Sequence, residues 1–302
     1  MLLSDLSKAD CYTALKHNAL TVDFGVVKVN VGTSLKAVSD NFFELYKNYD
    51  VSTDSDWFDF NISVKQPNNV RRFYKKQAVF KLDDHIPFKP LPLAHAYPLL
   101  EWGMNWCVAN FYHNYLIFHA AVLEKNGKAI IFPAPPGSGK STLCAYLAMK
   151  GWRLLSDEMA IIELDSCKVR PFVRPVCLKN NSISLVKGWF PDAHISNIAV
   201  DTQKGDVAHM RPPCEAVSRR HETCDIFGVV FPKFEAGAQT EVFQLSQTNA
   251  LCLLLENAFN FDLFEHAAFD MLSTLIPKLM LLEATYSNIE ELKSLLDEQV
   301  AD

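Results

Sequence analysis

Hydrophobic and polar residues alternate along the first part of the chain with the spacing of strands and then of a helix. Positions 20–31 alternate and are rich in valine, which predicts a strand. A helix capped by Thr33 or Ser34 is expected to follow. Its apolar stripe consists of Leu35, Val38, Phe42, Leu45, Tyr46 and Tyr49. Further runs at 57–64 and 77–82 predict two more strands.

A proline-rich stretch, FKPLPLAHAYP at positions 88–98, interrupts this pattern. Prolines at this density end regular structure and are typical of a boundary between domains. We therefore expect a small α+β module over residues 1–92 and a second domain over residues 93–302.

Strand and helix patterns are interleaved in the second part. In chain order they predict a helix over 97–113, strands over 115–123 and 128–132, a helix over 141–150, a strand over 153–164 broken at its acidic pair, and a strand over 279–284. The dipeptide Asn126-Gly127 predicts a hairpin between the first two of these strands. Ser287 and Glu290 have the spacing of a capping box that opens a final helix. This interleaving is typical of an α/β fold.

Charge and cysteine usage exclude several classes of protein. The 302 residues include 29 basic and 35 acidic side chains, a net charge of −6, which argues against a nucleic-acid partner. Positions 102–123 hold no charged residue except histidine, but their asparagines and histidines are too polar for a membrane span. The eight cysteines never form a CxxC pair, and the first twenty residues lack a secretion-signal pattern. We expect a cytoplasmic protein with reduced thiols and no membrane partner.

The run APPGSGKST matches the phosphate-binding loop of nucleotide-binding proteins, with alanine in place of the usual first glycine. It predicts ATP binding by Ala134, Pro135, Pro136, Gly137, Ser138, Gly139, Lys140, Ser141 and Thr142. The glycines allow backbone N–H groups to turn towards phosphate oxygens. Lys140, expected in a solvent-facing loop, would reach the β and γ phosphates, and the Ser141 hydroxyl would bind Mg²⁺. The predicted strand before the loop and helix after it are the required context.

Two acidic residues follow this helix closely. Asp157 and Glu158 come directly after a short apolar run, whereas the Mg²⁺-binding Asp of ordinary phosphate-loop ATPases lies further downstream. A carboxylate this near the γ-phosphate can also take the proton from an acceptor hydroxyl. We therefore predict a catalytic role for Asp157 and a metal site of Ser141, Asp157 and Glu158. The alternative is an Asp that only caps the turn at a strand end.

His119, in the apolar run IFHAAVL, lies on the strand before the hairpin. A lone histidine in an apolar strand is more often a core residue than a functional one. The residues alone therefore favour a core role for His119.

The run from Phe118 to Ile162, FHAAVLEKNGKAIIFPAPPGSGKSTLCAYLAMKGWRLLSDEMAII, resembles the catalytic domain of bacterial HPr kinase/phosphorylase. The later stretches RPVCLKNNS, DTQKGDVAHMRPP and VVFPKF are more similar to the HPr-kinase-related kinases, the HPr(Ser) kinase-related A branch. The resemblance extends from Tyr115 to the end of the chain. It implies a phosphate-loop kinase core of the HPr kinase and phosphoenolpyruvate-carboxykinase-like type.

The resemblance also implies roles for particular residues. Asp157 matches the family's catalytic acid or base, and His119 matches its histidine, which makes His119 a candidate catalytic residue beside Lys140. Glu158 replaces the family's second Asp, and Thr142 stands where the HPr enzymes typically have Glu. These departures count against the reverse phosphorylase activity and against HPr as the substrate. They count less against the expected kinase chemistry.

Cationic residues further along the chain form a second group of candidates. Lys204, His209 and Arg211 lie around a glycine in a mostly polar stretch, which predicts a mobile loop whose cations close over a transferring phosphoryl group. Arg174 and Lys179 have the same predicted role. The alternative is a solvated basic turn.

Together these features predict an ATP- and Mg²⁺-dependent kinase that phosphorylates a hydroxyl, with a serine of a protein or peptide as the expected acceptor. Two alternatives stay open: a kinase or phosphoenolpyruvate-carboxykinase-like transferase acting on a small molecule, and a nucleotide-gated binding protein without turnover. A homo-oligomer is also left open, since the resembled HPr enzymes are hexameric.

Overall fold

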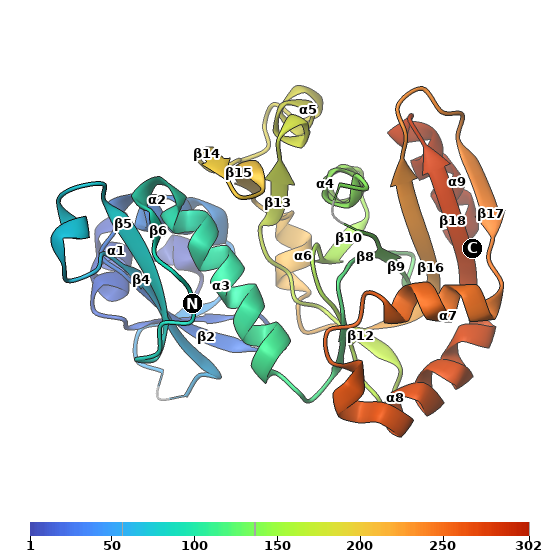
Figure 1. Ribbon diagram of the computed structural model, residues 1–302, viewed down its shortest axis with the longest axis horizontal. Coiled ribbons are helices and arrows are strands. Elements are labelled where there is room, and N and C mark those ends of the chain that lie inside the picture. The colour runs from blue at the N-terminus through green and yellow to red at the C-terminus, as the bar shows by residue number, and fades with distance from the viewer. Residues whose placement is uncertain (56, 136, 302) are drawn as a thin grey trace. The chain divides into compact units, whose positions relative to one another are not determined.

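The computed structural model of the protein describes residues 1–55, 57–135 and 137–301 (Figure 1). Within them the chain forms two compact units, each made of two separate stretches. One unit combines residues 1–108 with 177–218, and the other combines residues 109–176 with the chain from residue 219 onward. Both units mix helices and strands, so the fold is α/β in the broad sense expected. The division at residues 92 and 93 stays a prediction.

The first unit is built around a six-stranded sheet with the strand order β3-β1-β2-β4-β5-β6. The strands are β1 (Leu20–Asp23), β2 (Lys28–Thr33), β3 (Val51–Ser52), β4 (Phe60–Lys65), β5 (Gln77–Leu82) and β6 (Leu91–Pro92). β2 and β4 are parallel, and every other described pair in this sheet is antiparallel. Its helices are α1 (Lys8–Lys16), α2 (Lys36–Tyr46) and the first part of α3 (Ala96–Phe111). β5 has the predicted bounds, whereas β4 begins three residues later than predicted.

The single strand predicted over positions 20–31 is wrong, because the chain turns back within it. β1 and β2 pair with each other as an antiparallel hairpin. In the turn, the Asp23 carboxylate accepts a 2.7 Å hydrogen bond from the backbone of Gly25, whose φ is +86°. The Asp-x-Gly signal for a turn was therefore present inside the alternating run.

Helix α2 buries its predicted apolar stripe, but its predicted cap is wrong. The N-cap position is Leu35, and no side chain there caps the helix. Thr33 instead donates a 2.7 Å hydrogen bond to the Val64 carbonyl and accepts one from the Leu35 backbone. The hydroxyl that could have capped the helix is thus used to join β2 to β4.

The second stretch of this unit holds a small sheet with the order β13-β15-β14. Its elements are β13 (Val176–Lys179), α5 (Asn181–Trp189), β14 (Ala199–Thr202), β15 (Gly205–Met210) and α6 (Cys214–Ser218). A mobile loop was predicted around positions 201–213. The structure has a β14–β15 hairpin there instead, with Gly205 at φ +81° in its turn.

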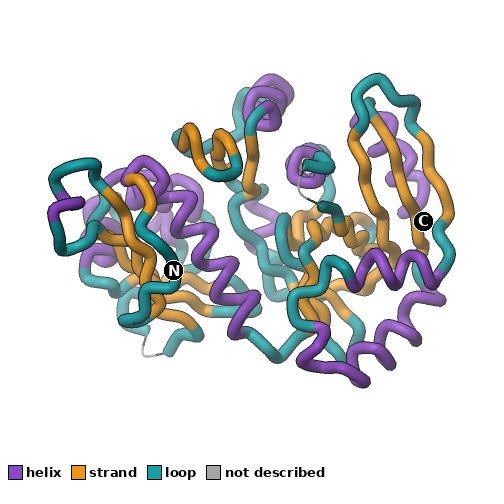
Figure 2. The backbone as a smooth tube through the Cα atoms, in the orientation of Figure 1, coloured by secondary structure: helices purple, strands orange, loops and turns teal. Residues whose placement is uncertain are grey.

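The second unit is a nine-stranded mixed sheet (Figures 1 and 2). Seven strands follow the order β10-β8-β9-β16-β12-β11-β7, and β18 pairs with β16 and with the edge strand β17. The strands are β7 (Leu116–Phe118), β8 (Ala120–Lys125), β9 (Lys128–Pro133), β10 (Arg153–Ser156), β11 (Ala160–Ile162), β12 (Lys168–Arg170), β16 (Cys224–Phe234), β17 (Glu241–Gln244) and β18 (Met280–Tyr286). The helices are α4 (Lys140–Met149), α7 (Gln247–Leu255), α8 (Phe261–Leu275) and α9 (Ile289–Val300). β9, β16 and β18 run parallel.

Strands β9 and β18 and helix α4 lie within two residues of their predicted bounds. Of the other sequence predictions in this unit, two hold and two do not. Asn126 and Gly127 form the β8–β9 turn, both with positive φ, and the strand over 153–164 is broken at its acidic pair. The strand predicted over 115–123 is divided, because β7 and β8 pair with different neighbours on either side of His119. Helix α9 is capped by Asn288 and not by Ser287, whose hydroxyl donates to the Ala238 carbonyl.

The core of this unit lies between the sheet and helices α7 and α8. Val122 and Ile131 belong to this core, so the alternate residues Leu123 and Ile130 face the other side of the sheet. Helix α4 packs against β8, β10 and α9. Among the residues described, no helix combines the length and the apolar character needed to cross a membrane.

Candidate functional site

Three chain segments meet at one edge of the nine-stranded sheet. β9 ends at Pro133, which pairs with Ala120 at the beginning of the antiparallel strand β8. β10 ends at Ser156, which pairs with Val122 of β8. The segment after β9, the residue before β8 and the turn after β10 therefore lie close together, and they contain Lys140, His119 and Asp157.

The segment between β9 and α4, residues 134–139, is called here the glycine loop. Ala134 is buried and Pro135 is exposed, whereas Pro136, which was predicted to bind phosphate, lies outside the described residues. Gly137 and Gly139 have φ values of +91° and +87°, a region that favours glycine. The loop is tied to β16 by a 3.1 Å hydrogen bond from the Phe234 backbone N–H to the Ser138 carbonyl.

Gly139 is also packed against the strands behind it. A Cβ atom at this position would lie 3.0 Å from Cβ of Phe234 and 3.2 Å from the Tyr286 hydroxyl. Burial raises the pKa of Tyr286, so this hydroxyl stays neutral beside the loop. The loop is therefore closely fitted to the ends of β16 and β18 at this point.

Lys140 is the first residue of α4 and is buried, not solvent-facing as predicted. Its ammonium group donates a 2.9 Å hydrogen bond to the backbone carbonyl of Asp157. The same nitrogen lies 3.4 Å from Nε2 of His119. The structure thus brings together the three residues predicted to be catalytic, from segments up to 38 positions apart.

Asp157 is buried at the end of β10, directly after an irregularity in the strand. The pairing of β10 with β8 shifts by one residue between Leu154 and Ser156, which is the signature of a β-bulge. A bulge turns the following side chain away from its regular direction. The adjoining turn is held by a 3.1 Å hydrogen bond from the Met159 backbone to the Ser156 hydroxyl.

Cys144 is a contact of Asp157 that the sequence reasoning missed. Its thiol lies one helical turn after Lys140, is buried and interacts with the Asp157 carboxylate. Burial raises the pKa of this thiol well above its ordinary value, and the charge of Asp157 raises it further. The i, i+4 spacing from Lys140 could have identified Cys144 as a residue on the same helix face.

His119 is half-buried, and its backbone and ring contact the segment between α7 and α8. Its backbone N–H donates a 2.7 Å hydrogen bond to the Asn257 carbonyl, and its ring lies 5.8 Å from the Phe259 ring. The buried side chain of Asn260 accepts from the Ile117 backbone and donates to the Tyr115 carbonyl. These contacts join residues about 140 positions apart in the sequence, so no local sequence pattern predicts them.

The remaining predicted residues of this unit line the same region. Ser141 and Thr142 are half-buried in the first turn of α4, and Glu158 is half-buried after Asp157. The Ser138 hydroxyl is buried and has no hydrogen-bond partner among the residues described. Within those residues, no group of three or more His, Cys, Asp or Glu side chains could hold a metal ion.

The predicted cationic residues divide between the two units. Arg174 is buried in the unit that holds the glycine loop, with its guanidinium 5.2 Å from the Phe172 ring. Lys179, Lys204, His209 and Arg211 belong to the other unit.

Within that other unit, two of these cations are packed into regular structure. His209 is buried in β15 with its ring against Tyr97, and Arg211 donates a 3.1 Å hydrogen bond to the Glu44 carbonyl. Burial lowers the pKa of Arg211, and the nearby Glu44 partly offsets this effect. Lys204 is exposed in the β14–β15 turn, and Lys179 is half-buried at the end of β13. The proposed phosphate contact of all four stays a prediction.

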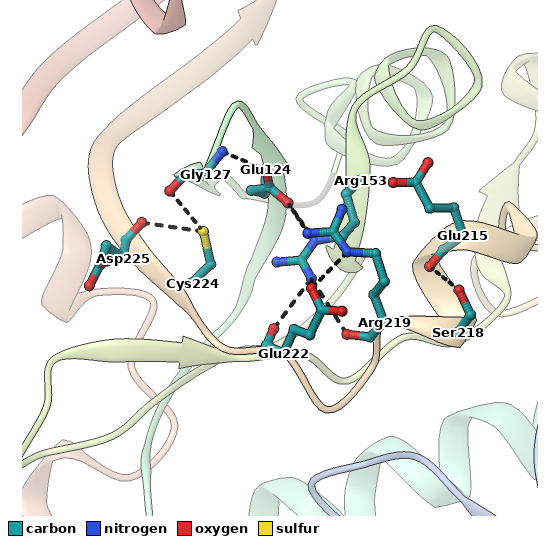
Figure 3. Close-up of polar contacts among 9 residues, drawn as sticks. All are labelled: Glu124, Gly127, Arg153, Glu215, Ser218, Arg219, Glu222, Cys224 and Asp225. Atoms are coloured by element: carbon teal, nitrogen blue, oxygen red, sulfur yellow. Dashed lines mark hydrogen bonds and ion pairs between the residues drawn. The ribbon is translucent and has the colours of Figure 1, made fainter.

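A separate polar cluster lies at the opposite end of β8 and β10 (Figure 3). Nε of Arg153 lies 2.5 Å from a carboxylate oxygen of Glu124, and both side chains are almost fully buried. Glu124 also accepts a 2.7 Å hydrogen bond from Gly127, and Arg153 pairs with the exposed carboxylate of Glu222 at 3.4 Å. This cluster joins the β8–β9 turn to the start of β10, so we assign it a structural role.

No known protein family has a model that matches this chain, and a search among curated proteins finds no match. The fold and the site therefore define this chain only as a mixed α/β protein. At one edge of its larger sheet lie the glycine loop, the N-terminus of α4 and the buried contact between Lys140 and Asp157.

Proposed function

We propose that the protein is an ATP- and Mg²⁺-dependent kinase with an HPr-kinase-like phosphate-loop core, and that it transfers the γ-phosphoryl group to a hydroxyl. The expected acceptor is a serine of a protein or peptide. The observation that carries the proposal is that Lys140, His119 and Asp157 lie together beside the glycine loop. They provide an ammonium group, an imidazole and a carboxylate, respectively.

The residues of the glycine loop and of the start of α4 are suited to bind the phosphates of a nucleoside triphosphate. The first N–H groups of a helix lack partners within the helix and carry a partial positive charge, so the start of α4 favours an anion. The buried Ser138 hydroxyl has no hydrogen-bond partner among the described residues and can donate to a phosphate oxygen. Lys140 adds a positive charge at the same point.

A magnesium ion fits the site only as an ion held chiefly by phosphate oxygens and water. Mg²⁺ in kinases typically uses one or two protein oxygens, which here would be those of Ser141 and of Asp157 or Glu158. When bound, it would neutralise phosphate charge as the phosphoryl group is transferred. The lack of a larger ligand cluster in the described residues is compatible with this mode.

Asp157 is proposed as the general base. The acceptor oxygen forms its bond to the γ-phosphorus, the bond from that phosphorus to the β–γ bridging oxygen breaks, and the acceptor proton passes to the Asp157 carboxylate. Lys140 neutralises charge on the transferred group. The buried thiol of Cys144, which interacts with the Asp157 carboxylate, is proposed to help orient it.

The first test is nucleotide binding and turnover by the purified protein. Calorimetry should detect ATP binding, and ATP hydrolysis should require added Mg²⁺. Ser141→Ala should weaken metal-dependent turnover more than it weakens binding of nucleotide alone. Full activity in excess chelator would remove the metal assignment, and absence of ATP binding would remove the proposal.

The second test identifies the acceptor class. Incubation with γ-labelled ATP and cell extract should place the label in a polypeptide band, and the label should be lost with Asp157→Asn. Label found only in small molecules would favour the small-molecule kinase. Binding without hydrolysis or label transfer under every condition would favour a nucleotide-gated binding protein.

A further inference from the structure

One part of the first unit is strongly basic although the chain is acidic overall. Six of the 29 basic side chains, and none of the 35 acidic ones, fall within residues 61–82. The other 280 residues carry 35 acidic and only 23 basic side chains. The net charge of the chain therefore hides a local excess of positive charge.

The centre of this segment is the tip of the β4–β5 hairpin, residues 66–76, called here the basic tip. It contains a short 3₁₀ turn, Val70–Arg72, and extends beyond the paired strands (Figure 2). The turn is capped by the side chain of Asn69, which accepts a 2.9 Å hydrogen bond from Arg71. The Lys76 carbonyl accepts a 2.9 Å hydrogen bond from Leu93 beside β6. The tip therefore contains a capped turn, and its last residue is hydrogen-bonded to the segment after β6.

Three large apolar side chains of the basic tip point into solvent. The exposed fractions are 69% for Val70, 78% for Phe73 and 64% for Tyr74. Phe73 is the most exposed of the large hydrophobic residues in the described part of the chain. Neighbouring apolar side chains this exposed mark an interaction site more often than an ordinary surface.

Four cations are interleaved with these apolar residues in the sequence, namely Arg71, Arg72, Lys75 and Lys76. None of the four forms an ion pair with a residue that the structure describes. The nearest acidic residues in the sequence, Asp59 and Asp83, flank the opposite end of the hairpin, because Ile62 pairs with Leu82 there. The positive charge of the tip is therefore not neutralised locally.

We propose that the basic tip docks the protein onto an anionic lipid surface. Val70, Phe73 and Tyr74 would enter the boundary between headgroups and acyl chains, while the four cations contact acidic headgroups. This combination of apolar side chains and clustered Lys and Arg is the one that peripheral membrane segments use. The proposal does not depend on the proposed kinase activity, and it departs from the sequence-based expectation of no membrane partner.

The geometry favours a membrane over the other polyanions and over a folded protein. A nucleic acid is bound along a track of cations, whereas here the cations lie at one tip of an otherwise acidic chain. A stable protein interface uses roughly 20–30 residues from each partner, and the tip offers eleven. A planar membrane needs contact only with the tip itself.

The test is cosedimentation of the full chain with vesicles of phosphatidylcholine, with and without phosphatidylserine. We expect binding only to the anionic vesicles, with a steep decrease as salt is added. Replacing Arg71, Arg72, Lys75 and Lys76 by Gln should lower the partition coefficient by roughly 100-fold or more. Phe73→Ser with Tyr74→Ser should lower it by about ten-fold or more with all charges kept.

A matched variant controls for net charge. Lys16, Lys89, Lys187 and Lys278 are exposed lysines outside the tip, and their joint replacement by Gln should leave vesicle binding within about two-fold of the unmodified protein. Soluble glycerophosphoserine should not compete, since it lacks acyl chains. An equal loss in the control variant, or no binding to anionic vesicles, would overturn the proposal. Tip-dependent binding to polyuridylate or polyglutamate without vesicle binding would also overturn it and assign another partner class.

Discussion

The ammonium group of Lys140 donates a hydrogen bond to the backbone carbonyl of Asp157 at 2.9 Å. The start of α4 is thereby joined directly to the turn after β10. The bonded carbonyl belongs to the residue whose carboxylate is proposed as general base, so a change at Lys140 also removes a contact of Asp157. The two residues therefore have to be tested separately, with variants that preserve side-chain shape.

Lys140→Met should lower ATP affinity by at least about ten-fold, because the phosphates lose their charged partner. Since Lys140 is buried and hydrogen-bonded, we also expect a loss of about 1 kcal/mol in the free energy of unfolding. Calorimetry and urea unfolding measure the two effects. Lys150→Met, at the exposed C-terminal end of the same helix, is the control and should change neither.

Asp157→Asn should bind MgATP nearly normally but transfer the phosphoryl group roughly 10²–10⁴-fold more slowly, because the amide cannot accept the proton. Glu158→Gln should reduce the rate by less than about ten-fold if Glu158 only supports the metal. Single-turnover kinetics with labelled ATP distinguish the two. A larger loss at Glu158 would exchange the roles assigned to these residues.

Gly139→Ala should be more damaging than Gly137→Ala. Both residues have positive φ, which costs an alanine about 1–2 kcal/mol. At Gly139 the added methyl would also meet Phe234 and Tyr286. At Gly137, apart from the adjacent residues in the chain, no heavy atom of the described residues would lie within 4 Å of the added methyl. Urea unfolding of both variants measures the difference, and equal losses would mean that the loop is not closely packed against β16 and β18.

Glu124→Gln should lower the free energy of unfolding by about 3 kcal/mol, because it removes the buried one of the two ion-pair partners of the buried Arg153 (Figure 3). Glu222→Gln removes the exposed partner of the same arginine and should cost less than about 1 kcal/mol. Chemical denaturation of both variants at neutral pH is the measurement. Similar losses would contradict the burial-based assignment.

Asp297 on α9 provides a prediction of pH dependence. Burial alone would raise its pKa, but hydrogen bonds from Lys125, Lys293 and Trp152 outweigh burial and hold the pKa below its ordinary value of 3.8. The unfolded chain therefore takes up this proton first as the pH falls. The stabilisation is present above about pH 4 and is lost as the pH falls through the lower pKa of the folded state.

Asp297→Asn should consequently be less stable than the unmodified protein by about 1 kcal/mol at pH 7. The difference should decrease towards zero as the pH falls through the pKa of the folded carboxyl. Urea unfolding at a series of pH values between neutral and strongly acidic conditions measures it. A difference that stays constant over this range would show that the Asp297 charge does not stabilise α9.

Local elements of the fold were predictable from the sequence wherever neighbouring residues decide the outcome. The Asn126-Gly127 turn and the apolar stripe of α2 follow from backbone conformation and from helical spacing. The strand–loop–helix arrangement around residues 128–149 does as well. The same kind of reasoning failed for the helix caps. At Thr33 and Ser287 the hydroxyl is used by a distant carbonyl, and that competition cannot be seen in a local window.

The candidate site was predictable as a set of residues but not as an arrangement. The spacing and types of Lys140 and Asp157 single them out in the sequence, whereas His119 became a candidate only through the family resemblance. Only the strand order, with β8 between β9 and β10, brings them together. The bulge before Asp157, the thiol of Cys144 and the anchoring of His119 by Asn257 were not predicted. The bulge and the anchoring depend on pairing between strands and on contacts over about 140 positions, which a sequence read locally does not contain.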